Sequence, residues 1–180
     1  MAALVSLLRG INLGPNKRVR MEDLKNIYES LGLRKVTTYV QSGNVVFECG
    51  KSDPARIAKK IEDAVAKNLR VESRVIIRSA DELRGVIKRN PIALDASRNP
   101  RQLQVFFLDE QPDRKAIDSI PNLYSGTEEI EVIDKECYVY YFDGIGRSKL
   151  NVERLLKVVG TARNWNTVMR LAELAAQIEK

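Results

Sequence analysis

Residues 2–21 read AALVSLLRGINLGPNKRVRM, and this stretch predicts how the chain begins to fold. The apolar run from Ala2 to Leu8 is typical of a buried strand. Residues 9–20 then contain two glycines, one proline, two asparagines and four basic side chains, which is typical of a loop. A plain connection needs only about 2–6 residues. This long cationic loop is therefore the strongest functional candidate in the chain.

The rest of the first half predicts alternating strands and helices around that strand. Gln41-Ser42-Gly43 separates two β-branched runs and is typical of a hairpin turn, while Asp53-Pro54 is a typical helix start. The predicted elements are a helix over residues 21–31, strands over 36–40 and 44–47, a helix from Pro54 and a strand over 75–77. Together with the first strand they give the ferredoxin-like βαββαβ order, a sheet with helices on one face.

The second half predicts an imperfect copy of the same order. After a connecting helix with a capping box at Ser79 to Glu82, the copy has no closing strand and ends in two helices. Its predicted elements are a strand over 102–108, a short helix over 112–120, a hairpin of 127–133 and 136–142, and helices over 152–159 and from Asn164. The predicted fold class is therefore α+β, with a βαββαβ subdomain followed by an imperfect βαββ copy with C-terminal helices.

A domain boundary is predicted in the segment from Pro91 to Arg101, which carries a proline near each end and Ser, Asn and Asp between them. The expected division is a ferredoxin-like α+β subdomain with its connecting helix over residues 1–91, and a second α+β subdomain over residues 92–180.

The composition favours anionic partners and excludes several kinds of catalytic site. The 180 residues have a net charge of +6 and a pI of about 9.4, so the protein's field attracts anions. They contain no histidine, which excludes Ser-His-Asp and Cys-His catalysis and His-ligated zinc. We expect no metal site. An enzyme remains open, with Lys17, Tyr39 and Asp143 as acid-base candidates, and the sequence predicts no particular cofactor.

The sequence also predicts a cytoplasmic protein. Residues 1–8, MAALVSLL, are too few to span a bilayer, and no basic residue precedes them as in a signal peptide. Cys49 and Cys137 form no paired motif, which fits a reducing compartment.

Two sets of residues can supply an anion site. In the first loop, Gly10 and Gly14 permit close backbone approach, and Arg9, Lys17 and Arg18 can bind an oxyanion. The hairpin turn can add the polar groups of Gln41, Ser42 and Asn44. Solvation and turn formation alone explain the same residue types, so both interpretations stay open. The loop contains neither GxxxxGK[ST] nor GxGxxG.

Two later segments have a similar character. Arg163-Asn164-Trp165-Asn166 precedes the last helix, whose N-terminal amides favour an anion, although Trp165 is more typical of a core. Gly144 to Lys149 is rich in glycine and basic residues, but such a run is also common in ordinary loops.

Three of these segments resemble the signature of the DUF1697 family of bacterial proteins. They are LLRGINLG at residues 7–14, TYVQSGNVVF at 38–47 and RNWNT at 163–167. The resemblance implies ferredoxin-like α+β subdomains and carries no established activity. It also suggests that Arg9, Asn12, Gln41, Asn44, Arg163, Asn164 and Asn166 converge in space.

The leading functional hypothesis is therefore binding of a small anionic ligand, a nucleotide or a phosphorylated metabolite. Nucleic-acid binding through phosphate contacts and a protein-interaction module are the alternatives. The strands at Ala2 to Leu8 and Asn44 to Phe47 offer only Phe47 as an aromatic residue and have no RNP-like pattern. The oligomeric state is left open. The predicted ligand-binding residues are Arg9, Gly10, Asn12, Gly14, Lys17, Arg18, Gln41, Ser42, Asn44, Arg163, Asn164 and Asn166.

Overall fold

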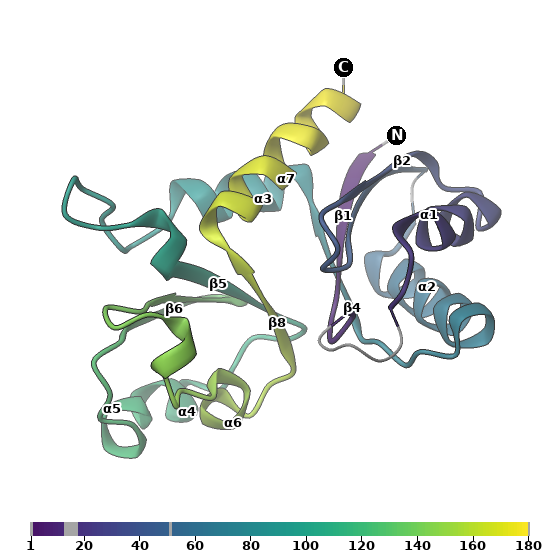
Figure 1. Ribbon diagram of the computed structural model, residues 1–180. Coiled ribbons are helices and arrows are strands. Elements are labelled where there is room, and N and C mark those ends of the chain that lie inside the picture. The colour runs from purple at the N-terminus through teal and green to yellow at the C-terminus, as the bar shows by residue number, and fades with distance from the viewer. Residues whose placement is uncertain (1, 13–17, 51, 180) are drawn as a thin grey trace. The chain divides into compact units, whose positions relative to one another are not determined.

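A computed structural model describes residues 2–12, 18–50 and 52–179 (Figure 1). Its first half forms an antiparallel sheet of four strands in the order β2-β3-β1-β4. The elements are β1 (Ala2–Leu8), α1 (Met21–Ser30), β2 (Arg34–Tyr39), β3 (Asn44–Cys49), α2 (Pro54–Leu69) and β4 (Val75–Ser79). The strand and helix order predicted for this half is confirmed.

Helices α1 and α2 lie side by side on one face of this sheet (Figure 1). Alternation along β1 places Leu4 and Leu8 on that face, where they join a core formed with apolar residues of both helices. The hydroxyl of the fully buried Tyr28 is satisfied by the Ser6 hydroxyl at 2.7 Å. At the start of α2, the Asp53 carboxylate accepts from the Ala55 amide, as predicted for a capping residue.

The second half forms another antiparallel sheet of four strands, in the order β6-β7-β5-β8. Its helices α4, α5 and α6 are short. The elements are α3 (Ala80–Lys88), a 3-10 turn (Pro100–Gln102), β5 (Leu103–Leu108), α4 (Arg114–Asp118), α5 (Ile120–Leu123), β6 (Glu129–Ile133), β7 (Glu136–Tyr140), a 3-10 turn (Ile145–Arg147), α6 (Val152–Leu156), β8 (Gly160–Asn164) and α7 (Trp165–Ile178). The predicted capping box is confirmed, because Ser79 and Glu82 each accept from the other's amide.

The two halves repeat each other in register as well as in order. The amide of Leu8 donates to the carbonyl of Gly43 at 2.9 Å, and the amide of Leu108 donates to that of Lys135 at the same distance. Each closing strand also carries a buried arginine, Arg78 opposite Val5 in the first copy and Arg163 opposite Val105 in the second. Each of these arginines donates to the carbonyl of its preceding residue. The second half is therefore a complete copy.

The prediction that the second copy lacks a closing strand is wrong. Residues Gly160–Asn164 form β8, which pairs with β5 over its whole length. Glycine, alanine and asparagine have weak strand preferences, and here pairing with β5 outweighs them. Gly160 allows close approach, because a Cβ atom there would lie 2.8 Å from Cδ2 of Leu108 and 3.0 Å from the carbonyl oxygen of Phe107.

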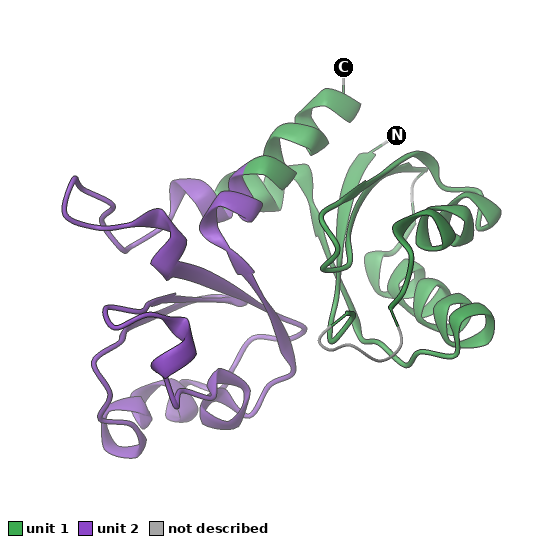
Figure 2. Cartoon of the chain, viewed as in Figure 1, with its two compact units in different colours: residues 1–85, 170–180 green, residues 86–169 purple. Residues whose placement is uncertain are grey.

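Contacts divide the chain into two compact units, unit 1 with residues 1–85 and 170–180, and unit 2 with residues 86–169 (Figure 2). The chain therefore passes from one unit to the other inside α3 and again inside α7. The predicted subdomains of residues 1–91 and 92–180 stay a prediction. In the part of the chain that the structure describes, no helix is long and apolar enough to cross a membrane.

Candidate functional site

The side chain of Asn12 ties the first loop to the β2–β3 hairpin turn. Its Nδ2 donates to the carbonyl oxygens of Val19, at 3.1 Å, and of Gln41, at 2.9 Å. Its Oδ1 accepts from the amide of Val19 at 2.7 Å. Residues 9–12, 18–20 and 40–43 are therefore held as one assembly, which we call the paired turns.

Several residues of the paired turns have left-handed backbone conformations. Gly10 and Gly43 have φ angles of 74° and 72°, and Asn12 has 58°. Val40 has φ 49° although a β-branched residue strongly disfavours this region, and the residue is 50% exposed. A Cβ atom on Gly43 would lie 2.8 Å from the Cβ of Leu8, so glycine is needed there for packing too. Strain of this kind clusters at functional sites.

The polar residues of the hairpin have different local roles. Asn44 is fully buried and its Nδ2 donates to the Tyr39 carbonyl at 3.0 Å and to the Ser42 hydroxyl at 2.8 Å. Asn44 therefore closes the turn from inside. Gln41 is exposed and offers its carbonyl to Asn12, which leaves the amide of its side chain on the surface of the paired turns.

The cations of the first loop lie on the same assembly. Arg9 is exposed, and two hydrogen bonds fix its backbone. Its amide donates to the Arg74 carbonyl, and the Ser73 hydroxyl donates to the Arg9 carbonyl at 2.8 Å. Arg18 is also exposed, and Arg20 pairs with Glu22 at 3.0 Å. The predicted site residues Gly14 and Lys17 lie outside the described residues.

The candidate residues near the last helix have structural partners in unit 2. Arg163 is 7% exposed, and its Nη1 donates to the Thr161 hydroxyl and the Ala162 carbonyl, both at 2.7 Å. Burial lowers the pKa of its guanidinium to about 10. Asn164 donates to the Arg101 carbonyl at 2.8 Å and accepts from the amide of Asn166, whose side chain is exposed.

The structure brings together the predicted residues of the first loop and the hairpin through Asn12. Arg163, Asn164 and Asn166 belong to unit 2 instead of unit 1. Their convergence with the paired turns stays a prediction. Trp165 is 8% exposed, in agreement with a core residue.

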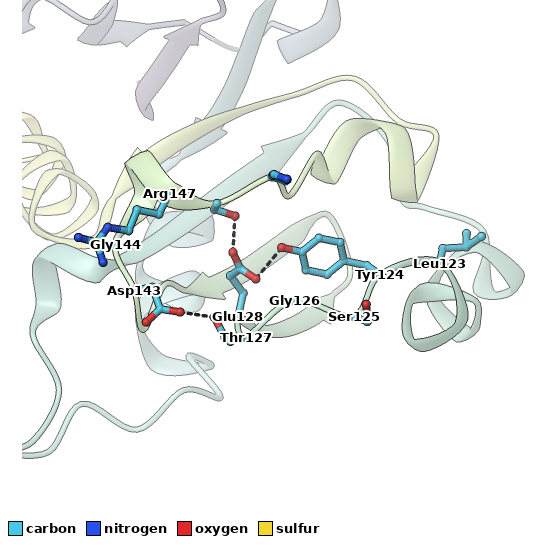
Figure 3. A pocket seen from close by; sticks show the side chains of 11 residues that line it. Leu123, Tyr124, Ser125, Gly126, Thr127, Glu128, Asp143, Gly144 and Arg147 are labelled. Atoms are coloured by element: carbon cyan, nitrogen blue, oxygen red, sulfur yellow. Dashed lines mark hydrogen bonds between the residues drawn. The ribbon is translucent and has the colours of Figure 1, made fainter.

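Unit 2 contains a pocket that the sequence indicated only weakly (Figure 3). It has a volume of about 640 Å³, within the range of small-molecule sites. One wall is the loop of residues 143–149, which the sequence favoured as an ordinary loop, and another is residues 123–128, which the sequence did not indicate as a site. No sequence motif links these two segments.

The carboxylate of Glu128 accepts two side-chain hydrogen bonds in this pocket. The donors are the Tyr124 hydroxyl, at 2.6 Å, and the Ser148 hydroxyl (Figure 3). Burial raises the pKa of the Glu128 carboxyl, but these hydrogen bonds outweigh burial and hold it below its ordinary value. The carboxylate is therefore ionised at neutral pH. Across the described residues, no group of three or more His, Cys, Asp or Glu side chains is placed to hold a metal ion.

The fold and these sites define a mixed α+β protein with two four-stranded antiparallel sheets. Residues 1–138 match the family model described as "Protein of unknown function (DUF1697)", so the chain belongs to that family. The match includes the paired turns but not residues 143–149 or 163–167. The resemblance inferred from the three sequence segments is confirmed.

A solved structure of a conserved bacterial protein from Streptococcus pneumoniae has a similar fold. The TM-score is 0.75 at 22% sequence identity, and the similarity covers 97% of this chain and 98% of that one. This identity supports a shared fold and nothing about activity. No match was found among curated proteins.

Proposed function

We propose that this protein binds a small phosphate-bearing ligand at the paired turns. The observation that carries the proposal is an internal comparison between the two copies of the repeat. The β1–α1 connection spans residues 9–20, whereas the matching β5–α4 connection spans only residues 109–113. The short connection joins the same two elements of the repeat, so the fold does not require the extra residues.

The two connections also have opposite charge. Arg9 and Asp109 occupy equivalent positions in the two copies. Each residue follows the first strand of its copy, and its amide donates to the carbonyl of the residue just before the closing strand. That residue is Arg74 in the first copy and Val159 in the second. The short connection continues with acidic residues, DEQPD, whereas the long one contains four basic residues and no acidic one. The same corner of the fold is therefore cationic in one copy only, which favours an anion there.

The chemistry of the paired turns suits a phosphate group. Two exposed guanidinium groups, of Arg9 and Arg18, can make paired charge-assisted hydrogen bonds to phosphate oxygens. Gly10 has open space where a Cβ atom would be, so its backbone is accessible. Gln41 can add a neutral donor. Asn12 and Asn44 hold this arrangement in place through the hydrogen bonds described above.

Calorimetric titration with pyrophosphate and with adenosine 5′-monophosphate tests the proposal. We expect Arg9→Gln and Arg18→Gln each to weaken binding by about tenfold or more, the value of a charged hydrogen bond. Arg56→Gln is the matched control, because it removes the same charge from an exposed site on α2. The proposal fails if neither probe binds, or if the control weakens binding as much as the two loop variants do.

Nucleic-acid binding is a distinct outcome of the same test. It would give binding to oligonucleotides alone, with a steep loss of affinity as salt rises. Binding of a small phosphate compound that persists at high salt would favour the proposal instead.

We also propose that each sheet with its helices is a ferredoxin-like subdomain. The strand order β2-β3-β1-β4, its counterpart β6-β7-β5-β8 and the antiparallel pairing throughout support this assignment. An experimental structure with a different strand order in either sheet would overturn it.

A further inference from the structure

The pocket of unit 2 is lined by charged residues of both signs. Glu128 and Asp143 contribute carboxylates, and Arg147 and Lys149 contribute cations. Arg147 and Lys149 are exposed, so both cations are accessible from solvent.

These four charged groups do not pair with one another. Within the described residues of unit 2, no ion pair joins either carboxylate to Arg147 or Lys149. Hydrogen bonds hold the carboxylates elsewhere: Glu128 accepts from Tyr124 and Ser148, and Asp143 accepts from Thr127 at 2.8 Å. In Figure 3 the Arg147 side chain extends away from Glu128. The two carboxylates and the two cations of the pocket are therefore not ion-paired with one another.

From this arrangement we infer that the pocket binds a small zwitterion, a molecule with an ammonium and an anionic group such as a free amino acid or a short peptide. The ammonium lies against Asp143 and Glu128, and the carboxylate against Arg147 and Lys149. A purely anionic ligand would face two carboxylates without compensation, and a purely cationic one would face two cations. This site is independent of the paired turns, which contain no acidic residue in the described segments.

Two glycines shape the pocket for a ligand. A Cβ atom on Gly126 would clash with the Tyr124 hydroxyl and the Glu128 carboxylate, so glycine leaves room for these two groups to meet there. Gly144 has φ 84°, and this left-handed conformation turns the loop so that Asp143 and Arg147 both line the pocket. A neighbouring cavity of about 300 Å³ shares Tyr124 and Lys149 and offers room for a side chain.

Calorimetric titration with the free amino acids and with alanylalanine tests the inference. The best binding probe is compared with its N-acetyl form, which lacks the ammonium, and its C-terminal amide, which lacks the carboxylate. We expect each derivative to bind about tenfold or more weakly than the zwitterion. We expect Asp143→Asn and Arg147→Gln to weaken binding of the zwitterion by a similar factor. Asp143→Asn should bind the zwitterion and its N-acetyl form with equal affinity, and Arg147→Gln should bind the zwitterion and its C-terminal amide with equal affinity.

Two control variants keep the charge of the protein matched. Glu110→Gln and Arg101→Gln remove the same charges from exposed positions of unit 2 that do not line the pocket. They should bind the probe as the unchanged protein does. The inference is overturned if no probe binds at millimolar concentration, if the derivatives bind as well as the zwitterion, or if the controls weaken binding equally. We expect Arg9→Gln to weaken phosphate binding at the paired turns and to leave zwitterion binding in unit 2 unchanged. Failure of one proposal can therefore be distinguished from failure of the other.

Discussion

In the first copy of the repeat the β1–α1 connection is long and basic, whereas in the second copy the β7–α6 connection, residues 141–151, is the long one. The matching β3–α2 connection of the first copy spans only residues 50–53. Because β1 and β3 are antiparallel, connections that follow them lie at opposite ends of the sheet. Each copy has therefore enlarged a connection at a different end.

The comparison separates what the fold requires from what has been added to it. Both copies keep the hydrogen bond from the first strand to the hairpin turn, at Leu8 and Leu108, and the buried arginine of the closing strand. They differ in their long connections. The long connection of the first copy, residues 9–20, carries only basic charges, whereas that of the second, residues 141–151, carries charges of both signs. Loops on a constant scaffold are where proteins place binding residues. Each copy is thus an internal control for the other.

The largest expected effect is at the hairpin turns, where the two copies use different residues. Gly43→Ala should lower the free energy of unfolding by about 2–4 kcal/mol, because alanine is strained at φ 72° and its Cβ would crowd Leu8. Lys135→Ala, at the matching position of the second copy, should cost about 1 kcal/mol or less. Urea denaturation measures both. Equal costs would contradict the distinction between the two turns.

A smaller effect is expected at Asn12, whose hydrogen bonds hold the paired turns of the first copy together. Asn12→Ala removes hydrogen bonds to Val19 and Gln41 and places alanine at φ 58°, so we expect a loss of about 1–3 kcal/mol. Asn12→Asp keeps the acceptor for the Val19 amide and should fall between the two proteins in urea denaturation. If Asn12→Ala is as stable as the unchanged protein, the paired turns are not held together in this way.

The smallest effect concerns the acid dependence of the second copy's pocket. The folded pKa of Glu128 lies below its unfolded value, so its contribution to stability is fully present above about pH 4.5 and is lost as pH falls through the folded pKa. Glu128→Gln should therefore be less stable at neutral pH, and the difference should shrink in acid. Denaturation midpoints measured across this range for both proteins provide the test. A difference that stays constant with pH would show that the charge of Glu128 is not involved.

Sequence patterns predicted the elements that bury regular apolar stripes. The Ala2–Leu8 strand, the helix capped by Asp53 and the hairpin across Asp134 all follow from local periodicity and turn chemistry. Strand β8 was missed because its stability comes from pairing with β5, which lies more than fifty residues earlier in the chain. Local preference could not reveal that partner.

The candidate sites show the same limit. The glycines and basic residues of the first loop were visible in the sequence, but the bond from Asn12 to the Gln41 carbonyl is a contact between distant residues. Glu128 carried no signal at all, because Tyr124 and Ser148 reach it from separate segments. Side chains that act through long-range partners need the fold before they can be identified.

The passage of the chain through α3 and back through α7 bears on how the protein is made. During synthesis from the N-terminus, residues 170–180 of unit 1 leave the ribosome only after all of unit 2. These residues supply the Ile178 carbonyl that accepts from Lys35 at 2.9 Å and the Glu179 carboxylate that pairs with Arg84. The nascent chain must therefore hold unit 1 unfinished while unit 2 is translated, and the unit that begins first is completed last.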